Sequence, residues 1–377
     1  MTLGLRSSRS AAIAALTLTS LAGAQAHLTV PGQYPEISAA VQAAAPGDVI
    51  QVDWRQQPYQ PIVIDKTITI VGRALEHFAP TIAVAQGIGI DCQLQPGERA
   101  TLSRVDVIPV TGASQTTGVR VQGGFATLED CRIRGGVDAS GTGNLAAVDL
   151  IDTDVSVAFC RFQEGSGAVA LRATRSNVGV TDSRMIGSSF VVGDAVHLVD
   201  STLHAAECLI AGGEDFTGGP GAVAIRLQGS SRGYLVDCGV SGGTGQPGGI
   251  AIVNTTGTPV ELGRTSIGGG TTLSTFTSVA ASTGPVVTNN ALLGLLWSEP
   301  PYRRGTLQRG QGFGVHGRAA PGTVVLMLVG LAPTKTSKPF TRQPAMDLGE
   351  VLVGIPRLAD ANGYATFTAS VPDVPAA

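Results

Sequence analysis

Four polar side chains on a repeated strand unit could do chemistry together: Arg120, Asp149, Arg172 and His197. A polysaccharide lyase removes a proton from the carbon beside a sugar carboxyl group, so it needs a base and a cation that neutralises the carboxylate. Arg120, Arg172 and His197 are of the types that could supply these roles. A glycoside hydrolase would instead need two or three converging carboxylates, and Asp149 is the only carboxylate expected in this outward column.

The rest of this outward column is expected to carry few functional groups. Aligning the copies of the strand unit gives its members in chain order as Arg120, Asp149, Ala170, His197, Ala224 and Ala251, with Arg172 and Arg226 projecting two residues further along. Three alanines among six positions favour a non-catalytic surface.

A second set of charged residues flanks a column of cysteines. Arginines are expected in one outward column, at Arg104, Arg132, Arg161 and Arg184. Acids are expected in the opposite column, at Asp130, Asp182, Glu207 and Asp237. Guanidinium groups match carboxylates in bidentate fashion, so the arginines could bind an anionic polysaccharide such as a uronan. Compensation of the arginines by the adjoining acids is the favoured alternative.

The cysteines themselves predict an interior column rather than a metal or redox site. Cys131, Cys160, Cys208 and Cys238 occupy one repeat position, at which Ser103 and Ser183 are also placed. Small residues at one repeat position stack inside a solenoid, where disulfide geometry is seldom met and a metal has no open access. We therefore expect buried free thiols and no metal or cofactor. Cys92 falls outside this register.

The element that must position these residues is a repeat. Two strand units recur together, one around the cysteine column and one exemplified by Val119-Arg120-Val121. Successive copies lie roughly 21 to 31 residues apart, as expected for one supersecondary unit per repeat. Each unit alternates apolar and polar residues, so each predicts a strand with one face inward. Two strands per repeat, returning in register, predict the stacked coils of a parallel β-solenoid.

The first 26 residues are expected to be separate from the fold. Residues 1–26 combine a basic start, an apolar stretch and a small-residue cleavage motif, Ala24-Gln25-Ala26. This is the pattern of a secretory signal peptide and is too short for a membrane span. We expect a secreted or extracellular protein, with the cell surface or periplasm as alternatives, and no membrane span.

The segment that follows carries a resemblance to a known family. A short helix over Ile37–Ala44 leads through Pro46-Gly47-Asp48 to strands at 49–52, 62–64 and 67–72. This opening resembles that of pectin-lyase-like right-handed parallel β-helix proteins. The resemblance implies an all-β right-handed parallel β-helix over residues 27–290, with the helix capping the open end of the coils. It implies little about activity, because this fold hosts lyases, hydrolases, adhesins and proteins without activity.

The repeat stops near residue 290, and the pattern changes. Residues 291–377 contain alternating or continuous apolar segments, such as 313–317, 323–329, 351–353 and 364–369, separated by Pro-Gly and Asn-Gly turns. This pattern predicts a small antiparallel β-sandwich-like domain.

The composition argues against some classes of function. The chain has 51 glycines, 14% charged residues and a net charge of −3, which gives no electrostatic case for binding nucleic acid. We therefore favour a non-catalytic secreted protein that presents an extended surface for glycan or cell-surface binding, or for a structural role. The alternative is a polysaccharide lyase or glycoside hydrolase acting on an acidic polysaccharide.

Overall fold

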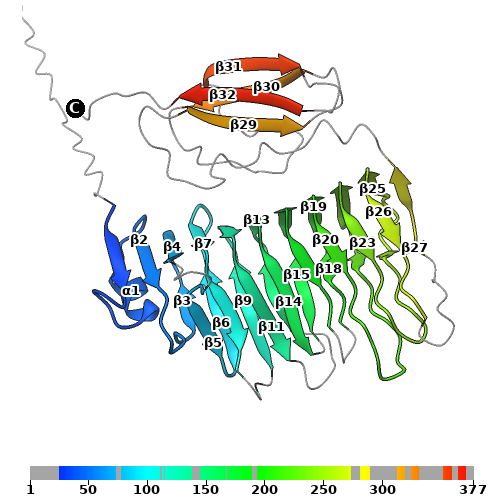
Figure 1. Ribbon diagram of the computed structural model, residues 1–377, viewed down its shortest axis with the longest axis horizontal. Helices are drawn as coiled ribbons and strands as arrows, with labels where there is room; N and C mark the ends of the chain where they lie inside the picture. The colour runs from blue at the N-terminus through cyan, green and yellow to red at the C-terminus, as the bar shows by residue number, and fades with distance from the viewer. Residues whose placement is uncertain are drawn as a thin grey trace, which may run out of the picture.

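The protein is a right-handed parallel β-helix whose chain winds through three parallel sheets (Figure 1). The computed structural model describes residues 25–73, 78–110, 113, 115–137, 145–166, 168–188, 193–272 and 281–288, and the backbone of four later strands. Residues 1–24, most of the expected signal peptide, lie outside the described residues. The structure confirms the resemblance in fold to the pectin-lyase-like β-helix.

Each sheet collects one strand from successive coils, so neighbouring strands in a sheet are far apart in the sequence. Sheet A contains β1 (His27–Val30), β2 (Val49–Asp53), β4 (Ile68–Arg73), β7 (Arg99–Ser103), β10 (Phe125–Glu129), β13 (Asp154–Ala158), β16 (Asn177–Thr181), β19 (Thr202–Ala206), β22 (Arg232–Val236), β25 (Val260–Gly263) and β28 (Val286–Thr288). Sheet B contains β5 (Thr81–Val84), β8 (Asp106–Pro109), β11 (Arg132–Val137), β14 (Arg161–Ser166), β17 (Arg184–Ile186), β20 (Leu209–Ala211), β23 (Gly239–Ser241) and β26 (Ser266–Gly268). Sheet C contains β3 (Ile62–Ile64), β6 (Gly87–Gln93), β9 (Thr116–Gln122), β12 (Ala146–Ile151), β15 (Val169–Thr174), β18 (Val196–Val199), β21 (Ile225–Gln228), β24 (Ile252–Asn254) and β27 (Ser282–Thr283).

The expectation of two strands per repeat was wrong, because full coils contribute three. The strand that was missed belongs to sheet A. It follows the sheet C strand after a corner of about two residues, such as Asp152-Thr153 between β12 and β13. A break this short leaves two strands looking like one segment in the sequence.

The core is a set of apolar columns that run along the axis of the helix. In sheet A, one inward column passes through Ile70, Leu102, Leu128, Val157 and Val180, all of them buried. Each coil contributes only a thin slice of apolar side chains, so its inner face is buried only by contact with the coils on either side.

The corner between sheets A and B depends on one residue in the left-handed conformation and on the side chain after it. The left-handed residues are Arg104, Asp130, Phe159, Asp182, Glu207, Asp237 and Arg264, with φ between 45° and 56°. Aspartate tolerates this region better than most residues, which explains its frequency here. Within this corner the cysteines replace missing backbone partners. The N–H of Cys131 donates to Sγ of Cys160 at 3.4 Å, and the N–H of Cys160 donates to Oγ of Ser183 at 2.9 Å.

The expected interior cysteine column is confirmed for Cys131, Cys160, Cys208 and Cys238, all buried and free. Each of these thiols also donates to the carbonyl oxygen two residues earlier, at 3.1–3.3 Å. Ser183 belongs to the column, but the placement of Ser103 was wrong. Ser103 aligns with Glu129 in sheet A. Asp106 aligns with Arg132, so the residue at the position of Cys131 is the buried Val105.

A matching hydroxyl column lies at the corner between sheets C and A. The N–H groups of Thr153, Ser176 and Ser201 donate to the hydroxyl of the next coil, at Ser176, Ser201 and Ser231, over 3.0–3.2 Å. Both corners therefore satisfy buried backbone groups with short side chains stacked from coil to coil. Cys92, which the sequence did not place, lies inward in β6 between Ile64 and Val121.

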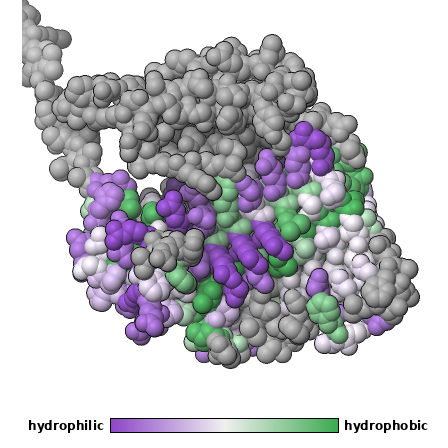
Figure 2. Space-filling view, viewed as in Figure 1, coloured by the Kyte–Doolittle hydropathy of each residue, from purple (hydrophilic) through white to green (hydrophobic). Residues whose placement is uncertain are grey.

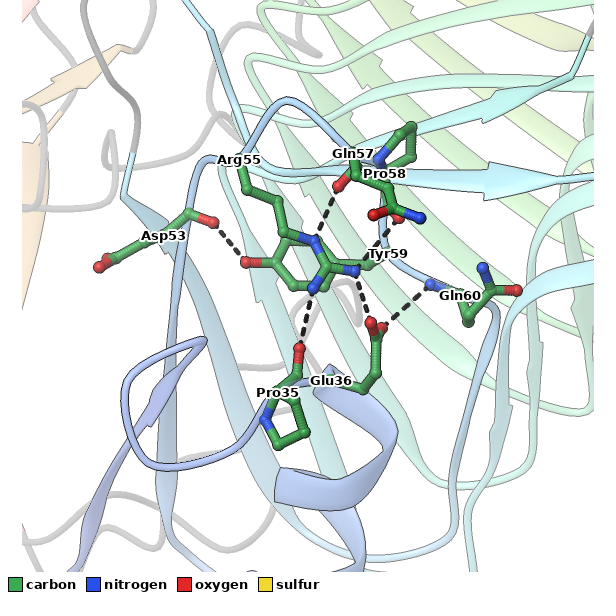
Figure 3. Close-up of polar contacts among 8 residues, drawn as sticks. All are labelled: Pro35, Glu36, Asp53, Arg55, Gln57, Pro58, Tyr59 and Gln60. Atoms are coloured by element: carbon green, nitrogen blue, oxygen red, sulfur yellow. Dashed lines mark hydrogen bonds and ion pairs between the residues drawn. The ribbon is translucent and has the colours of Figure 1, made fainter.

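Helix α1 (Ile37–Ala43) packs Ile37, Ala40 and Val41 against the core. A cluster around Arg55 fastens the segment that leads into this helix to the first coil (Figure 3). The Arg55 guanidinium lies 3.8 Å from the centroid of the buried Tyr59 ring. It donates to the carbonyl of Pro35 at 2.9 Å and to the carboxylate of Glu36, the residue that precedes the helix, at 2.6 Å.

The four C-terminal strands form two antiparallel pairs. Strand β29 (Gly312–Arg318) pairs with β32 (Tyr364–Ser370), and β30 (Val324–Gly330) pairs with β31 (Val351–Leu358). The strands fall where the sequence placed apolar segments, and a sandwich of the two pairs stays a prediction.

The loops from sheet B to sheet C in the later coils cross so closely that glycine is required. A Cβ atom added to Gly243 would lie 1.7 Å from the carbonyl oxygen of Gly213, whereas one added to Gly268 would meet nothing within 4 Å. We therefore expect Gly243→Ala to lower the free energy of unfolding by about 2–3 kcal/mol, because the backbone must shift to relieve the overlap. Gly268→Ala should stay close to the unmutated protein in a chemical denaturation series. Equal midpoints for the two variants would contradict this account of the loops.

Candidate functional site

The four candidate residues Arg120, Asp149, Arg172 and His197 lie in one outward column of sheet C. Backbone register aligns Arg120 with Asp149, Asp149 with Arg172, and Arg172 with His197, on four successive strands. Asp91 precedes this column, and Arg226 and Val253 continue it. The structure therefore brings together all four residues that the sequence singled out.

The expected alternation of this column with alanines was wrong. Ala170, Ala224 and Ala251 are fully buried members of the core, each two residues before the residue of its own coil that stands in the column, at Arg172, Arg226 and Val253. A shift of two residues preserves the inward and outward alternation of a strand, so the pattern of apolar residues cannot reveal it. The outer face of sheet C is consequently more highly charged than the sequence indicated.

The charges in this column are compensated in pairs between adjacent coils. Arg120 binds Asp91 through Nε–Oδ1 at 2.9 Å and Nη2–Oδ2 at 2.7 Å. Arg172 binds Asp149 in the same bidentate way, with both distances 2.8 Å. Arg226 binds Asp194 through Nε–Oδ2 at 2.5 Å, again reaching back one coil. Bidentate contacts of this kind fix the orientation of both side chains.

The pairing determines what the arginines can do chemically. Hydrogen bonds to Asp91 and Asp149 raise the pKa of Arg120 and Arg172 respectively, so both guanidinium groups hold their protons firmly. A guanidinium held in this state cannot take a proton from a substrate. His197 lies beyond the pairs, with Nε2 3.2 Å from Oε1 of Gln228.

The arginines of sheet B are arranged differently. Arg132, Arg161 and Arg184 align on adjacent strands β11, β14 and β17, as expected. Arg134 and Gln163 align in the neighbouring outward column of the same sheet. We call Arg132, Arg134, Arg161, Arg184 and Gln163 the arginine patch.

Arg104 does not belong to this patch, which corrects the sequence analysis. Arg104 aligns with Asp130 at the left-handed corner and forms an ion pair with it over 3.8 Å. The residue that aligns with Arg132 is Asp106. The error was a shift of two residues, from Asp106 to Arg104. Such a shift preserves the inward and outward alternation that would otherwise reveal it.

The arginines of the patch form no ion pair with any residue that the structure describes, in contrast to those of sheet C. Within the same described residues, the buried side-chain polar atoms without a hydrogen-bond partner are Nε of Arg132, Nε of Arg134 and Oε1 of Gln163. Burial, with repulsion from Arg132 and Arg161, lowers the pKa of Arg134. Burial also raises the pKa of Asp106 against the opposing effect of Arg132. The patch thus carries like charges with unused hydrogen-bonding capacity.

Sequence reasoning missed Arg134 and Gln163. They lie two residues beyond Arg132 and Arg161 in β11 and β14, so the period-two alternation places them on the same outer face. That signal was present in the sequence but was not applied past the first outward position. In the face that Figure 2 shows, hydrophilic residues gather in a band across the middle coils, bordered by hydrophobic ones.

A metal site needs several ligating side chains close together, and a membrane span needs a long apolar helix. Among the residues that the structure describes, no group of three or more His, Cys, Asp or Glu side chains could hold a metal ion. No described helix combines the length and apolar character needed to cross a bilayer.

Comparison with known proteins gives neighbours in structure alone. No protein-family model matches the sequence, and a search of curated proteins finds no match. Among solved structures, the Geobacillus virus E2 protein ORF18 matches with a TM-score of 0.37 and 10% identity, over 90% of this chain and 75% of that one. The pectate lyase Pel9A matches with a TM-score of 0.34 and 11% identity, over 70% and 68% of the two chains. The Dettilon tailspike protein gp208 matches with a TM-score of 0.28 and 10% identity, over 91% and 93%.

The ion pairs of sheet C give a prediction for stability. The Asp149 side chain is 7% exposed and its partner Arg172 is 22% exposed, so Asp149→Ala removes the carboxylate that a largely buried cation binds through two contacts. After allowance for the partial exposure, we expect a loss of about 2 kcal/mol of unfolding free energy. The control is Asp152→Asn, which removes the charge of the exposed bidentate pair with Arg175, keeps a side chain that suits the left-handed backbone at this position, and should leave the midpoint of chemical denaturation nearly unchanged. An equal effect of both substitutions would show that burial does not distinguish the two pairs.

Proposed function

We propose that the protein is a secreted, non-catalytic β-helix that binds an acidic polysaccharide or an acidic cell-surface glycan through the arginine patch of sheet B. The observation that carries the proposal is the contrast between two surfaces of one solenoid. Arg120, Arg172 and Arg226 of sheet C each form an ion pair with an aspartate, whereas no ion pair joins an arginine of the patch to an acid that the structure describes. Arg132 and Arg161 repel Arg134, so an external anion that neutralises these charges is stabilised on this surface.

The geometry favours a chain-like ligand over a small one. Arg132, Arg161 and Arg184 lie on adjacent parallel strands, which are spaced by about 4.8 Å. A linear ligand with repeated carboxylates could therefore meet successive arginines, each through a bidentate contact. Secretion remains part of the proposal, on the strength of the expected signal peptide over residues 1–26.

An acidic polysaccharide tests this directly. The double substitution Arg161→Ala with Arg184→Ala should weaken binding to polygalacturonate or alginate by about tenfold or more, because each arginine offers charge-assisted hydrogen bonds. Affinity electrophoresis in gels that contain the polyuronate measures the change, and binding should weaken as salt increases. The control with the same loss of charge is Arg175→Ala with Arg264→Ala, since both residues form exposed ion pairs. Equal retardation of both double variants, or no retardation of the unmutated protein, would rule out the patch as a specific site.

A second candidate function is a polysaccharide lyase or glycoside hydrolase at the sheet C column, because Arg120, Asp149, Arg172 and His197 do lie in one line. The ion pairs weigh against it, since they occupy Asp149 and hold both arginines in the protonated state.

We expect no ultraviolet-absorbing unsaturated product and no new reducing ends when the purified protein is incubated with polyuronates. Release of either product by the unmutated protein, and its loss in His197→Ala, would establish the enzyme in place of the binding protein. A contaminating activity would give the same release from both proteins.

A further inference from the structure

The outer face of sheet A differs in character from those of sheets B and C. Two outward columns toward the ends of its strands consist mainly of small or neutral residues. The first contains Ser103, Glu129, Ala158, Thr181, Ala206, Val236 and Gly263. The second contains Thr101, Thr127, Ser156, Gly179, His204, Tyr234 and Glu261. Among these fourteen positions only Glu129 and Glu261 are acidic, and none is Lys or Arg.

Several of these outward side chains are nevertheless almost inaccessible to solvent. Ala158, Ala206 and Val236 are 7%, 6% and 3% exposed, although they point away from the interior and do not belong to the apolar core. Their chain neighbours Ala205 and Leu235 occupy the inward positions and do belong to that core. A valine on the solvent side of a sheet ordinarily remains substantially exposed. Something other than the core therefore covers this face.

Titratable groups on the same face are also removed from water. Burial raises the pKa of Glu129, against the opposing effect of Arg104. Burial lowers the pKa of His204 to about 4, and the His204 ring stacks on Tyr234 with centroids 4.7 Å apart. Both shifts favour the uncharged form of the side chain, as expected where a sheet face is covered.

The C-terminal strands have the properties of the missing cover. The sequence of β30, VVLMLVG, is apolar at every position except its last glycine, and that of β31, VLVGIPRL, is apolar over most of its length. Such continuous runs are typical of strands buried on both faces. If the β29–β32 pair packed against the β30–β31 pair, it would bury only one face of β30 and β31. The other apolar face would still need a partner. An isolated two-stranded sheet is at best marginally stable in water, which strengthens the need for a second contact.

We propose that the outer face of sheet A is the docking surface for the C-terminal strands β29–β32 of the same chain, with the β30–β31 pair against it. Two sheets pack face to face at about 10 Å, and small side chains such as those of Ala158, Ala206 and Gly179 allow so flat an approach. Residues 289–311 connect β28 to β29 and could extend over about 70 Å, so they reach any part of sheet A. Because the linker holds β29–β32 near sheet A, their effective concentration at this face is higher than that of a second copy of the chain in solution.

Substitutions on the face test the docking in the full-length chain. Val236→Arg and Ala206→Arg place a charge on the covered columns, whereas Val63→Arg places the same charge on an outward position of sheet C that is 54% exposed. Hydrogen exchange measured by mass spectrometry should become at least about tenfold faster in β29–β32 for the first two variants. It should remain unchanged there in Val63→Arg and unchanged in the β-helix strands of all three proteins.

A second measurement does not depend on the folding of any variant. A specific protease site is inserted after Asn290, and the cleaved protein is examined by size-exclusion chromatography with mass determination. We expect the C-terminal fragment to elute with the β-helix. Separation of the fragment would overturn the proposal, and so would exchange in β29–β32 that neither substitution alters. A dimer that Val236→Arg converts to a monomer, without a change in β29–β32, would assign the face to a second copy of the chain and likewise overturn it.

Discussion

Every coil of this β-helix completes its backbone hydrogen bonds only with the coils on either side, and the other features of the molecule depend on that constraint. Parallel strands in fixed register turn each repeat position into a column, whether apolar, hydroxyl, thiol or charged. The constraint is hardest to meet at the corners, where the chain leaves one sheet for the next. There a left-handed residue such as Asp130 turns the chain, and Cys131 or Ser176 supplies the bond that the backbone has lost.

The interior could be predicted from the sequence because burial imposes a regular alternation of apolar and polar residues on each strand. The column through Cys131 and Cys160, the strands 49–52 and 62–64, and the helix that begins at Ile37 were all placed correctly. The outer columns were harder to predict, because alternation determines which face of the sheet a residue lies on but not its position along the strand. The positions assigned to Ala170 and Arg104 were therefore each wrong by two residues.

The two charged surfaces show how the order of charges along the axis determines chemistry. Sheet C runs Asp91, Arg120, Asp149, Arg172, so each arginine finds an acid one coil away. Sheet B runs Asp106, Arg132, Arg161, Arg184, so three arginines follow one another and an acid stands only at the start of this run. Both sets of residue types were recognisable in the sequence. Which set is neutralised follows from the register, and the register came from the structure.

The thiol column has a consequence for where such a chain can exist. Its cysteines act as short hydrogen-bonding side chains, and burial raises the pKa of Cys160 and Cys208 well above that of an ordinary thiol. Burial also raises the pKa of Cys92, outside the column, to about 12. Protonated, enclosed thiols are poor nucleophiles and poor targets for oxidants. With all five cysteines free, the coil stack has no cross-link to gain or lose. The same architecture therefore holds in a reducing compartment and in an oxidising one, and its integrity does not depend on disulfide-forming machinery.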